Sequence, residues 1–159
     1  DWFNGRRTPD ANPYLQGAII GLNLGTTAPA IYRALVEGAC CGARRIIERF
    51  RDNNIPVGSI IATGGISRKS PFVMQMCADL LNIPVKVAAS DQVCALGSAM
   101  FGAVAAGIHP DTQSAMKAMN SGFDMVYNPI PENVPVYEKI YRRYLRYANA
   151  VEKEQLQDA

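Results

Sequence analysis

The chain has 159 residues, of which 48% are hydrophobic and 19% are charged, and its formal net charge is +2. These values are typical of one globular domain with a substantial core. The small net charge gives no reason to expect a nucleic-acid or membrane-surface partner. The apolar runs are too short to cross a bilayer, and the polar and aromatic start does not resemble a secretory signal.

The cysteine and histidine content argues against a metal centre. The four cysteines have no C-x-x-C spacing, so we expect them to be buried free thiols, which favours a cytoplasmic location. They are Cys40, Cys41, Cys77 and Cys94. The only histidine, His109, lies beside Pro110 in an expected loop, and one histidine cannot form a Ser-His-Asp or His-metal cluster.

Residues 1–27 are punctuated by glycine and proline and are expected to form loops and turns. Thr27 is a suitable N-cap residue, and Pro29 falls in the first turn of the helix that should follow. Apolar residues then recur at helical spacing from Ala30 to about Arg51. Small residues crowd the middle of this helix, around Gly38 and Gly42, and predict close packing against another element.

A short strand is expected at Ser59–Thr63, followed by Gly64, Gly65 and a polar turn. Ser70 and Pro71 then have the types expected at the N-cap and first position of a helix that reaches about Leu81. Paired glycines at the carboxyl end of a buried strand let a ligand approach the backbone closely, and this is where open α/β sheets bind ligands. Taken alone, the pair fits a purely geometric turn equally well.

The second half of the chain continues the alternation of strands and helices. We expect a strand at 84–88, helices at about 95–106 and 111–119, an irregular segment at 123–133, and a final helix from about 135 to 154. Strands separated by helices imply parallel pairing through right-handed crossovers. Because two strands make a poor sheet, further strands are expected in a preceding part of the polypeptide, and the absence of an initiator Met agrees with this.

The final helix has an aromatic and aliphatic stripe that is expected to pack in the core, whereas its arginines are expected to form a solvated face. The stripe comprises Tyr137, Ile140, Tyr141, Tyr144, Leu145 and Ala148, and the arginines are Arg142, Arg143 and Arg146.

Four segments, in order between residues 4 and 107, resemble the C-terminal domain of sugar kinases of the FGGY carbohydrate kinase family. Residues 4–9 resemble a G-x-R-x-P turn, and residues 17–37 resemble the second family signature, with Ala30 where a polar residue is usual. Residues 63–75 resemble the adenosine motif, and residues 91–99 resemble the A-L-G-A-A helix that follows it.

The resemblance implies an α/β fold, as a fragment of the actin/Hsp70/hexokinase-like (ribonuclease H-like) ATPase domain, with a helical C-terminal tail. Residues 1–159 would be the C-terminal part of the second, nucleotide-binding domain, and the N-terminal sugar-binding domain would be absent from this chain. ATP and Mg²⁺ would be used to phosphorylate a sugar hydroxyl. In the family, the catalytic Asp, the sugar site and the phosphate loops lie outside the region matched here, so no catalytic residue is expected in this chain and the isolated chain should be inactive.

The nucleotide-binding residues implied by the resemblance are Gly64, Gly65, Ile66 and Lys69. The glycines would admit the nucleoside, Ile66 would offer an apolar contact, and Lys69 would reach the base, ribose or phosphate. Alternatively, Lys69 is a solvated loop charge.

Three neighbouring residues have simpler interpretations. Arg68 is equally well explained as a solvated charge, and Ser70 as a helix cap. Asp91 is a candidate cap for the helix at about 92–106.

Within the family, residues 1–7 and 64–69 most resemble ketopentose kinases that act on L-ribulose. Kinases of xylulose, glycerol or gluconate are alternatives, because the sugar-contacting residues would lie elsewhere. An alternative from another class is a non-catalytic interaction or homo-oligomerisation module that uses Tyr137, Tyr141 and Tyr144 as its surface.

Overall fold

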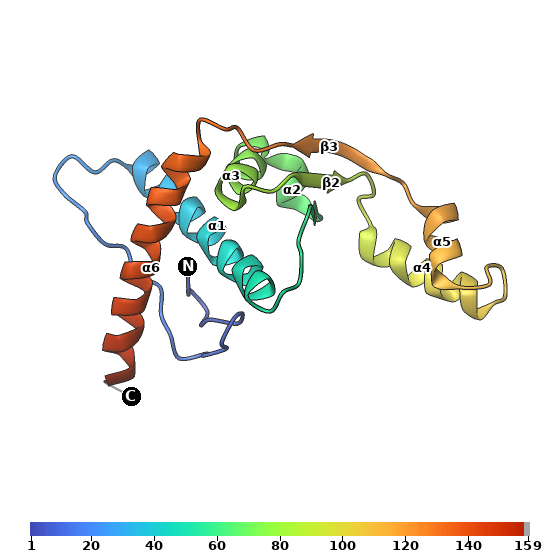
Figure 1. The fold of residues 1–159 in the computed structure, drawn as a ribbon, viewed down its shortest axis with the longest axis horizontal. Coiled ribbons are helices and arrows are strands. Elements are labelled where there is room, and N and C mark those ends of the chain that lie inside the picture. The colour runs from blue at the N-terminus through green and yellow to red at the C-terminus, as the bar shows by residue number, and fades with distance from the viewer. Residues whose placement is uncertain (158–159) are drawn as a thin grey trace.

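The computed structural model describes residues 1–157 as a three-stranded sheet with six helices. The elements are α1 (Ala28–Asp52), β1 (Ile60–Ala62), α2 (Gly65–Lys69), α3 (Pro71–Leu81), β2 (Val85–Ala88), α4 (Val93–Ala105), α5 (Thr112–Met119), β3 (Phe123–Tyr127) and α6 (Val134–Gln157). Figure 1 shows α1, α3 and α6 grouped around one end of the sheet, whereas α4 and α5 project from the other end.

The sheet has the order β1-β2-β3, and β1 and β2 are parallel as predicted, with Ile60 opposite Val85. The expectation of an irregular segment at 123–133 was wrong for its first half. Residues 123–127 form β3, which pairs antiparallel with β2. Its aromatic and β-branched residues suit a strand, and the prolines that suggested irregularity begin only at Pro129. The third strand therefore comes from within this chain.

Local capping explains where the two central helices begin and end. Thr27 accepts a hydrogen bond from the Ala30 amide at the start of α1, and Ser70 accepts one from the Val73 amide at the start of α3. Both caps agree with the sequence prediction. Helix α3 ends at Asn82, which adopts the left-handed conformation with φ of 50°.

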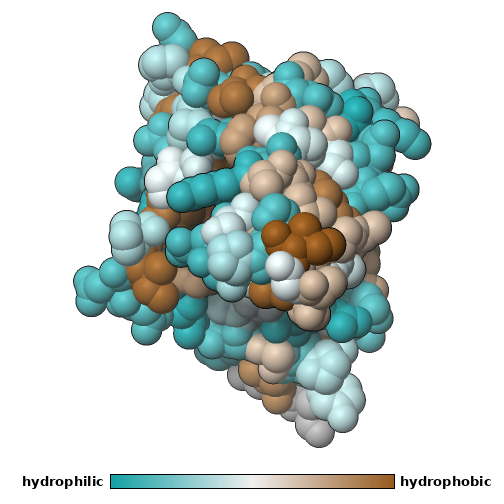
Figure 2. Space-filling view, turned by 90° about the vertical axis from the view of Figure 1, so that its right-hand side faces the viewer, coloured by the Kyte–Doolittle hydropathy of each residue, from teal (hydrophilic) through white to brown (hydrophobic). Residues whose placement is uncertain are grey.

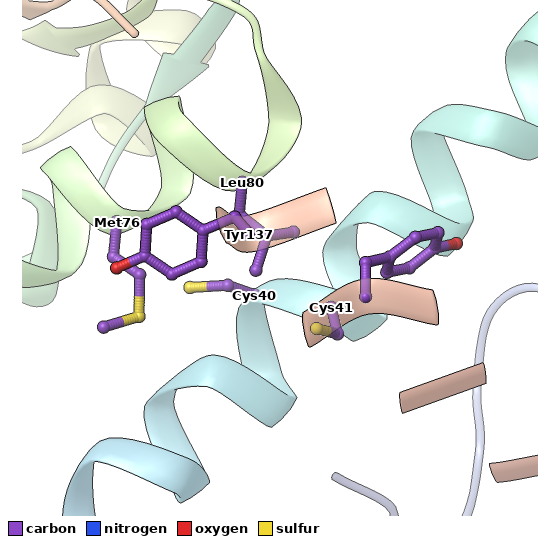
Figure 3. Packing of buried hydrophobic residues seen from close by; sticks show 6 residues of the cluster. Cys40, Cys41, Met76, Leu80 and Tyr137 are labelled. Carbon is purple, nitrogen blue, oxygen red and sulfur yellow. The ribbon is translucent and has the colours of Figure 1, made fainter. Parts of the chain in front are cut away.

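Helices α1, α3 and α6 share a hydrophobic core. Figure 3 shows Cys40 of α1, Met76 and Leu80 of α3, and Tyr137 of α6 gathered at this junction. Tyr141 is also buried there, and Tyr144 packs against the same cluster. The predicted core role of the α6 stripe is confirmed. Because these tyrosines pack against other residues of the chain, they do not form the free surface suggested for an interaction module.

The expectation that the cysteines are buried free thiols is confirmed in part. All four are free thiols; Cys40 and Cys41 are buried, Cys77 is half-buried, and Cys94 is exposed on α4. Burial raises the pKa of the Cys41 thiol to about 12, which makes it a poor nucleophile. Among the described residues, no helix is long and apolar enough to span a membrane.

Arg44 joins the three core helices through polar contacts. From α1, it donates to the Leu80 carbonyl of α3 at 3.2 Å and to the Glu138 carboxylate of α6 at 2.6 Å. It also pairs with Glu48 one turn later in α1, and its guanidinium lies 4.1 Å from the Tyr141 ring centroid. Burial opposes the charge of Arg44, but the hydrogen bonds to the two glutamates outweigh it, and its pKa is raised.

Asp79 fastens α3 to the connection between β3 and α6. This carboxylate is 2% exposed and accepts hydrogen bonds from the Ile130 amide at 2.8 Å and from the Asn133 side chain at 2.7 Å. The Gln75 side chain provides a third bond at 2.8 Å. A buried carboxylate needs such donors to compensate for lost hydration. These hydrogen bonds therefore link α3 to the residues that immediately precede α6.

The N-terminal segment lies along α6. Trp2 and Leu15 are buried against Ala148 of that helix. Arg6 donates two hydrogen bonds of 2.6 Å to the Glu152 carboxylate and lies 5.3 Å from the Trp2 ring centroid. Gly42 of α1 leaves room for the Asp1 side chain of the same segment, whereas no atom lies within 4 Å of a Cβ built on Gly38. The middle of α1 packs in the core as predicted, and of its two glycines Gly42 is the one at which a neighbouring side chain approaches closely.

Helices α4 and α5 form an arm that packs mainly on itself. Helix α4 is rich in alanine, glycine and other apolar residues but has no buried residue among those described. Phe101 on α4 and Met116 on α5 are 67% and 57% exposed. Figure 2, which views the molecule from this end, shows hydrophobic residues gathered between hydrophilic ones. Such exposure is typical of a surface covered by another part of a protein.

We predict that Arg44→Leu destabilises the fold by about 2–4 kcal/mol, because it leaves the Leu80 carbonyl without this donor and Glu138 without its half-buried partner. Urea unfolding followed by circular dichroism measures this. The matched control is Arg142→Gln, which removes the exposed arginine that pairs with the same Glu138 carboxylate, and it should cost less than about 1 kcal/mol. Equal effects of the two substitutions would contradict the junction role of Arg44.

The Arg6–Glu152 pair should make stability pH-dependent. The hydrogen bond from Arg6 lowers the pKa of Glu152 below its usual value. Its contribution is therefore complete above the unfolded carboxyl pKa of about 4.3 and is lost as pH falls through the lower folded pKa. We expect Glu152→Gln to destabilise the protein at about pH 7 but to have little effect at about pH 3. The exposed neighbour Glu154→Gln serves as control, and a pH-independent loss in Glu152→Gln would refute the prediction.

Candidate functional site

The candidate site lies where the two parallel strands end. Residues 64–69 follow β1 after Thr63, and Ala89 follows β2, so both connections emerge at the carboxyl edge of the sheet. Because β3 is antiparallel, its first residues lie at the same edge, with Phe123 opposite Ala88. This is the position at which open α/β sheets bind ligands.

Gly64 and Gly65 present bare backbone at this edge. Gly64 has φ of 89°, in the region that disfavours residues with a side chain, so its identity is required by the turn. The φ angle of Gly65 does not lie in this region. A Cβ atom placed on either glycine would meet no described atom within 4 Å. Both are exposed. The space in front of the Gly65 backbone is thus open to a ligand.

The turn after the glycines is a short helix, α2, that sequence reasoning described only as a polar turn. Ser67 is buried and donates a 2.7 Å hydrogen bond to the Gly64 carbonyl, which closes the turn. Ile66 is 66% exposed, and Lys69 is exposed with no ion pair to the residues that the structure describes. All four predicted binding residues are therefore exposed in the turn next to the strand ends.

Arg68 is exposed, but it is not an unpaired charge among the described residues. Its guanidinium donates to the Ala89 carbonyl at 2.8 Å and pairs with Asp91 at 2.9 Å and Asp124 at 3.0 Å. The side chain is 35% exposed. It therefore links α2 to the connection after β2 and to the start of β3.

Asp91 does not cap α4. The N-cap position belongs to Gln92, which makes no side-chain cap hydrogen bond. Asp91 instead contributes its carboxylate to Arg68. Asp124, which lies 56 positions after Arg68, was missed by sequence reasoning, because nothing local in the sequence indicates that β3 returns to this edge.

Another hollow in the structure lies elsewhere. This partly open pocket of about 500 Å³ lies between the N-terminal segment, α1 and α6, with Trp2, Leu35 and Tyr144 among its lining residues. None of residues 64–69 lines it. Because Asp1 forms part of its wall, its shape depends on the very start of the chain. The open edge of the sheet is the better candidate, since three loops with exposed polar groups converge there.

Within residues 1–157, no group of three or more His, Cys, Asp or Glu side chains is arranged to hold a metal ion. Asp91 and Asp124 both pair with Arg68, whose single positive charge offsets part of their combined charge and would compete with a cation for them. We therefore assign no metal site to the described residues.

Comparison with known proteins identifies the family. Residues 1–106 match the model of the FGGY family of carbohydrate kinases, C-terminal domain. The chain belongs to this family of carbohydrate kinases, as its motifs suggested.

Two curated relatives are ribulokinases. The chain is 47% identical over 153 residues to the ribulokinase of Vibrio parahaemolyticus and 43% identical over 148 residues to that of Bacillus licheniformis. These alignments cover 96% and 91% of this chain, but 27% of each relative. The chain thus spans about a quarter of the length of these relatives.

Solved structures of the family share the fold. The ligand-bound xylulose kinase of Lactobacillus acidophilus superposes with a TM-score of 0.87 at 26% identity, over 99% of this chain and 32% of that one. The glycerol kinase of Plasmodium falciparum with ADP gives a TM-score of 0.71 at 23% identity, over 95% of this chain and 29% of that one. The expected fold, a fragment of the actin-like ATPase domain, is confirmed, and its sheet is mixed because of β3.

The two glycines should respond differently to alanine. Gly64→Ala places a side chain at φ of 89° and should destabilise the protein by about 1–2 kcal/mol. Gly65→Ala is the matched control; it adds the same methyl group to open space in a helix and should change stability by less than about 0.5 kcal/mol. Thermal unfolding of the two variants tests this, and equal melting temperatures would contradict the assigned backbone strain.

Proposed function

We propose that this chain is the C-terminal part of the nucleotide-binding domain of an ATP-dependent ketopentose kinase, with L-ribulose as the substrate and L-ribulose 5-phosphate as the product. The whole protein would act in arabinose catabolism in the cytoplasm. The observation that carries the proposal is the exposed Gly64–Lys69 turn at the carboxyl edge of parallel strands, in a chain of the carbohydrate kinase family.

The roles of the chain's own residues follow from their exposure. Gly65 offers backbone without a side chain in front of it, so the flat adenine or the ribose can lie against it. Gly64 holds the turn, and Ile66 adds exposed apolar surface beside it. Lys69, on the same short helix, forms no ion pair within residues 1–157, and we assign its positive charge to the ribose or phosphate edge of the nucleotide.

The reaction itself would require groups outside this chain. The hydroxyl oxygen of the sugar forms a bond to the γ-phosphorus, the bond from that phosphorus to ADP breaks, and a carboxylate takes the hydroxyl proton. Mg²⁺ bound to the phosphates would neutralise the developing charge. We assign no residue of this chain to that ion or to the proton transfer. Residues 1–159 alone should therefore have no kinase activity.

The apolar arm supports the placement of this chain within a larger domain. Helix α4 has apolar residues on all sides but buries none of those described, and β1 lies at an edge of the sheet with Ile61 58% exposed. In the proposed whole protein, preceding strands of the same domain would cover these surfaces and extend the sheet beside β1.

The choice of L-ribulose is supported by the ribulokinases among the relatives. Kinases of xylulose, gluconate and glycerol are among the structural neighbours, at 23–26% identity, which is lower than the 47% and 43% of the two ribulokinases. The residues that would select the sugar lie in the proposed N-terminal domain. The substrate preference is therefore the finer part of the proposal and needs a direct test.

We expect the full-length protein to release ADP from ATP·Mg²⁺ with L-ribulose or D-ribulose in preference to D-xylulose, glycerol and gluconate. A coupled ADP assay across this panel measures it. Preference for another polyol would overturn the substrate but keep the family's reaction. Absence of turnover with every sugar by a folded protein would overturn the proposed function.

The nucleotide site is tested separately by Gly65→Trp. A Cβ at this position meets no described atom within 4 Å, so the side chain has room to start, and its indole would occupy the space assigned to the nucleotide. We expect ADP affinity in calorimetry to fall at least about tenfold, the equivalent of about 1.4 kcal/mol. Lys153→Trp, an exposed change on α6, is the control. Unchanged ADP binding in Gly65→Trp would remove Gly64–Lys69 from the site.

A further inference from the structure

Helix α2 has few means of holding its position. It contains five residues, too few for an isolated helix to be stable. Its N-cap residue, Gly64, provides no side-chain hydrogen bond, and Ser67 bonds only to the Gly64 carbonyl within the same turn. Every residue of this turn except Ser67 is exposed: Gly64, Gly65, Ile66, Arg68 and Lys69. A segment of this kind is expected to sample several positions unless another contact restrains it.

Arg68 is that contact. Among the described residues, it is the one side chain of α2 that forms hydrogen bonds or ion pairs with a distant part of the chain. Its partners come from both neighbouring elements: the Ala89 carbonyl and Asp91 follow β2, and Asp124 lies in β3. One guanidinium therefore joins the turn after β1 to the segment after β2 and to the beginning of β3, at the same edge of the sheet.

The arrangement separates Arg68 from its neighbour Lys69. Arg68 faces two carboxylates, Asp91 and Asp124, so its charge is already compensated, and it donates a hydrogen bond to the Ala89 carbonyl. Lys69 has the opposite properties, being exposed and without an ion pair to a described residue. The planar, forked guanidinium suits the first role because it can hold several acceptors in fixed directions, whereas an ammonium group behaves as a point charge.

We propose that Arg68 is a positioning residue, which holds the Gly64–Lys69 turn against the loops after β2 and before β3 so that a nucleoside phosphate meets a preformed backbone. This inference rests on the proposed function of the turn. Arg68 does not contact the nucleotide and takes no part in phosphoryl transfer. Without it, nucleotide binding must also order the turn, and that cost weakens affinity for nucleotide while the chemical step is unchanged.

The first test is Arg68→Gln in the full-length protein, with steady-state kinetics for ATP and sugar. We expect the KM for ATP and the Kd for ADP to rise about threefold to tenfold, with kcat and the sugar KM changed by less than about twofold. The matched control is Arg142→Gln, which removes an exposed, carboxylate-paired arginine on α6 and should leave all four constants unchanged. Loss of kcat together with unchanged ATP affinity would overturn the proposal.

A double-mutant cycle with Asp124→Asn separates positioning from general destabilisation. If the Arg68–Asp124 contact orders the turn, the effects of the two substitutions on ATP affinity are not additive, and the double variant resembles the weaker-binding single variant. Arg68→Lys should restore only part of the affinity, because one ammonium group cannot reproduce three directed contacts. Additive effects, or complete rescue by Lys, would overturn the proposal. Asp124→Asn alone provides the test if Arg68→Gln does not fold.

Hydrogen exchange provides a readout independent of activity. In the nucleotide-free protein, Arg68→Gln should accelerate amide exchange in residues 64–69 but not in α1 or α6. Unchanged exchange in this turn would contradict the positioning role. The outcome can be distinguished from failure of the proposed function: if Gly65→Trp abolishes ADP binding and Arg68→Gln does not alter it, the site stands and only the role of Arg68 is refuted.

Discussion

The packing of three helices around Arg44 is the constraint on which the rest of the structure depends. The three-stranded sheet is small, and its strands are three to five residues long, so it cannot hold the long helices by itself. Arg44 uses separate donors for a carbonyl of α3 and carboxylates of α1 and α6, and its face covers Tyr141. Because a half-buried arginine requires these partners, the contacts fix the relative positions of the helices as well as stabilising them.

Helix α3 connects this helical core to the candidate site. It is held between α1 and α6 on one side and β2 on the other, with Met76 and Leu80 in one cluster and Met74 and Ala78 in the next. Its first residue follows α2 almost directly, and the Ser70 cap fixes the direction in which the chain enters it. The packed part of the structure thus ends where the exposed turn of residues 64–69 begins. A binding turn carried by a packed scaffold and restrained by one charged side chain can remain accessible without being disordered.

Much of the fold and part of the site were predictable from the sequence. Helical periodicity and caps identified the long helices, and the paired glycines with Lys69 pointed to the edge of the sheet where the structure places them. The third strand was not recognised, because its pairing with β2 is decided by residues far apart in the chain. The same cause hid the role of Arg68, whose partner Asp124 comes close only when β3 returns, and it concealed the exposure of Cys94 on the projecting arm.

The sequence by itself determined the local features: the helix caps at Thr27 and Ser70, the parallel pairing of β1 and β2, the α6 stripe, and membership of the carbohydrate kinase family through its motifs. The caps, the stripe and the motifs depend on residue patterns within single segments, where backbone geometry and side-chain type act directly, and the parallel pairing follows from the alternation of strands and helices. Only the tertiary structure decided which charges meet. Arg68 and Arg142 are both arginines with carboxylate partners, yet one joins the loops of three strands and the other lies on the surface of α6. That difference arises because long-range contacts depend on how the chain returns on itself, which local sequence does not encode.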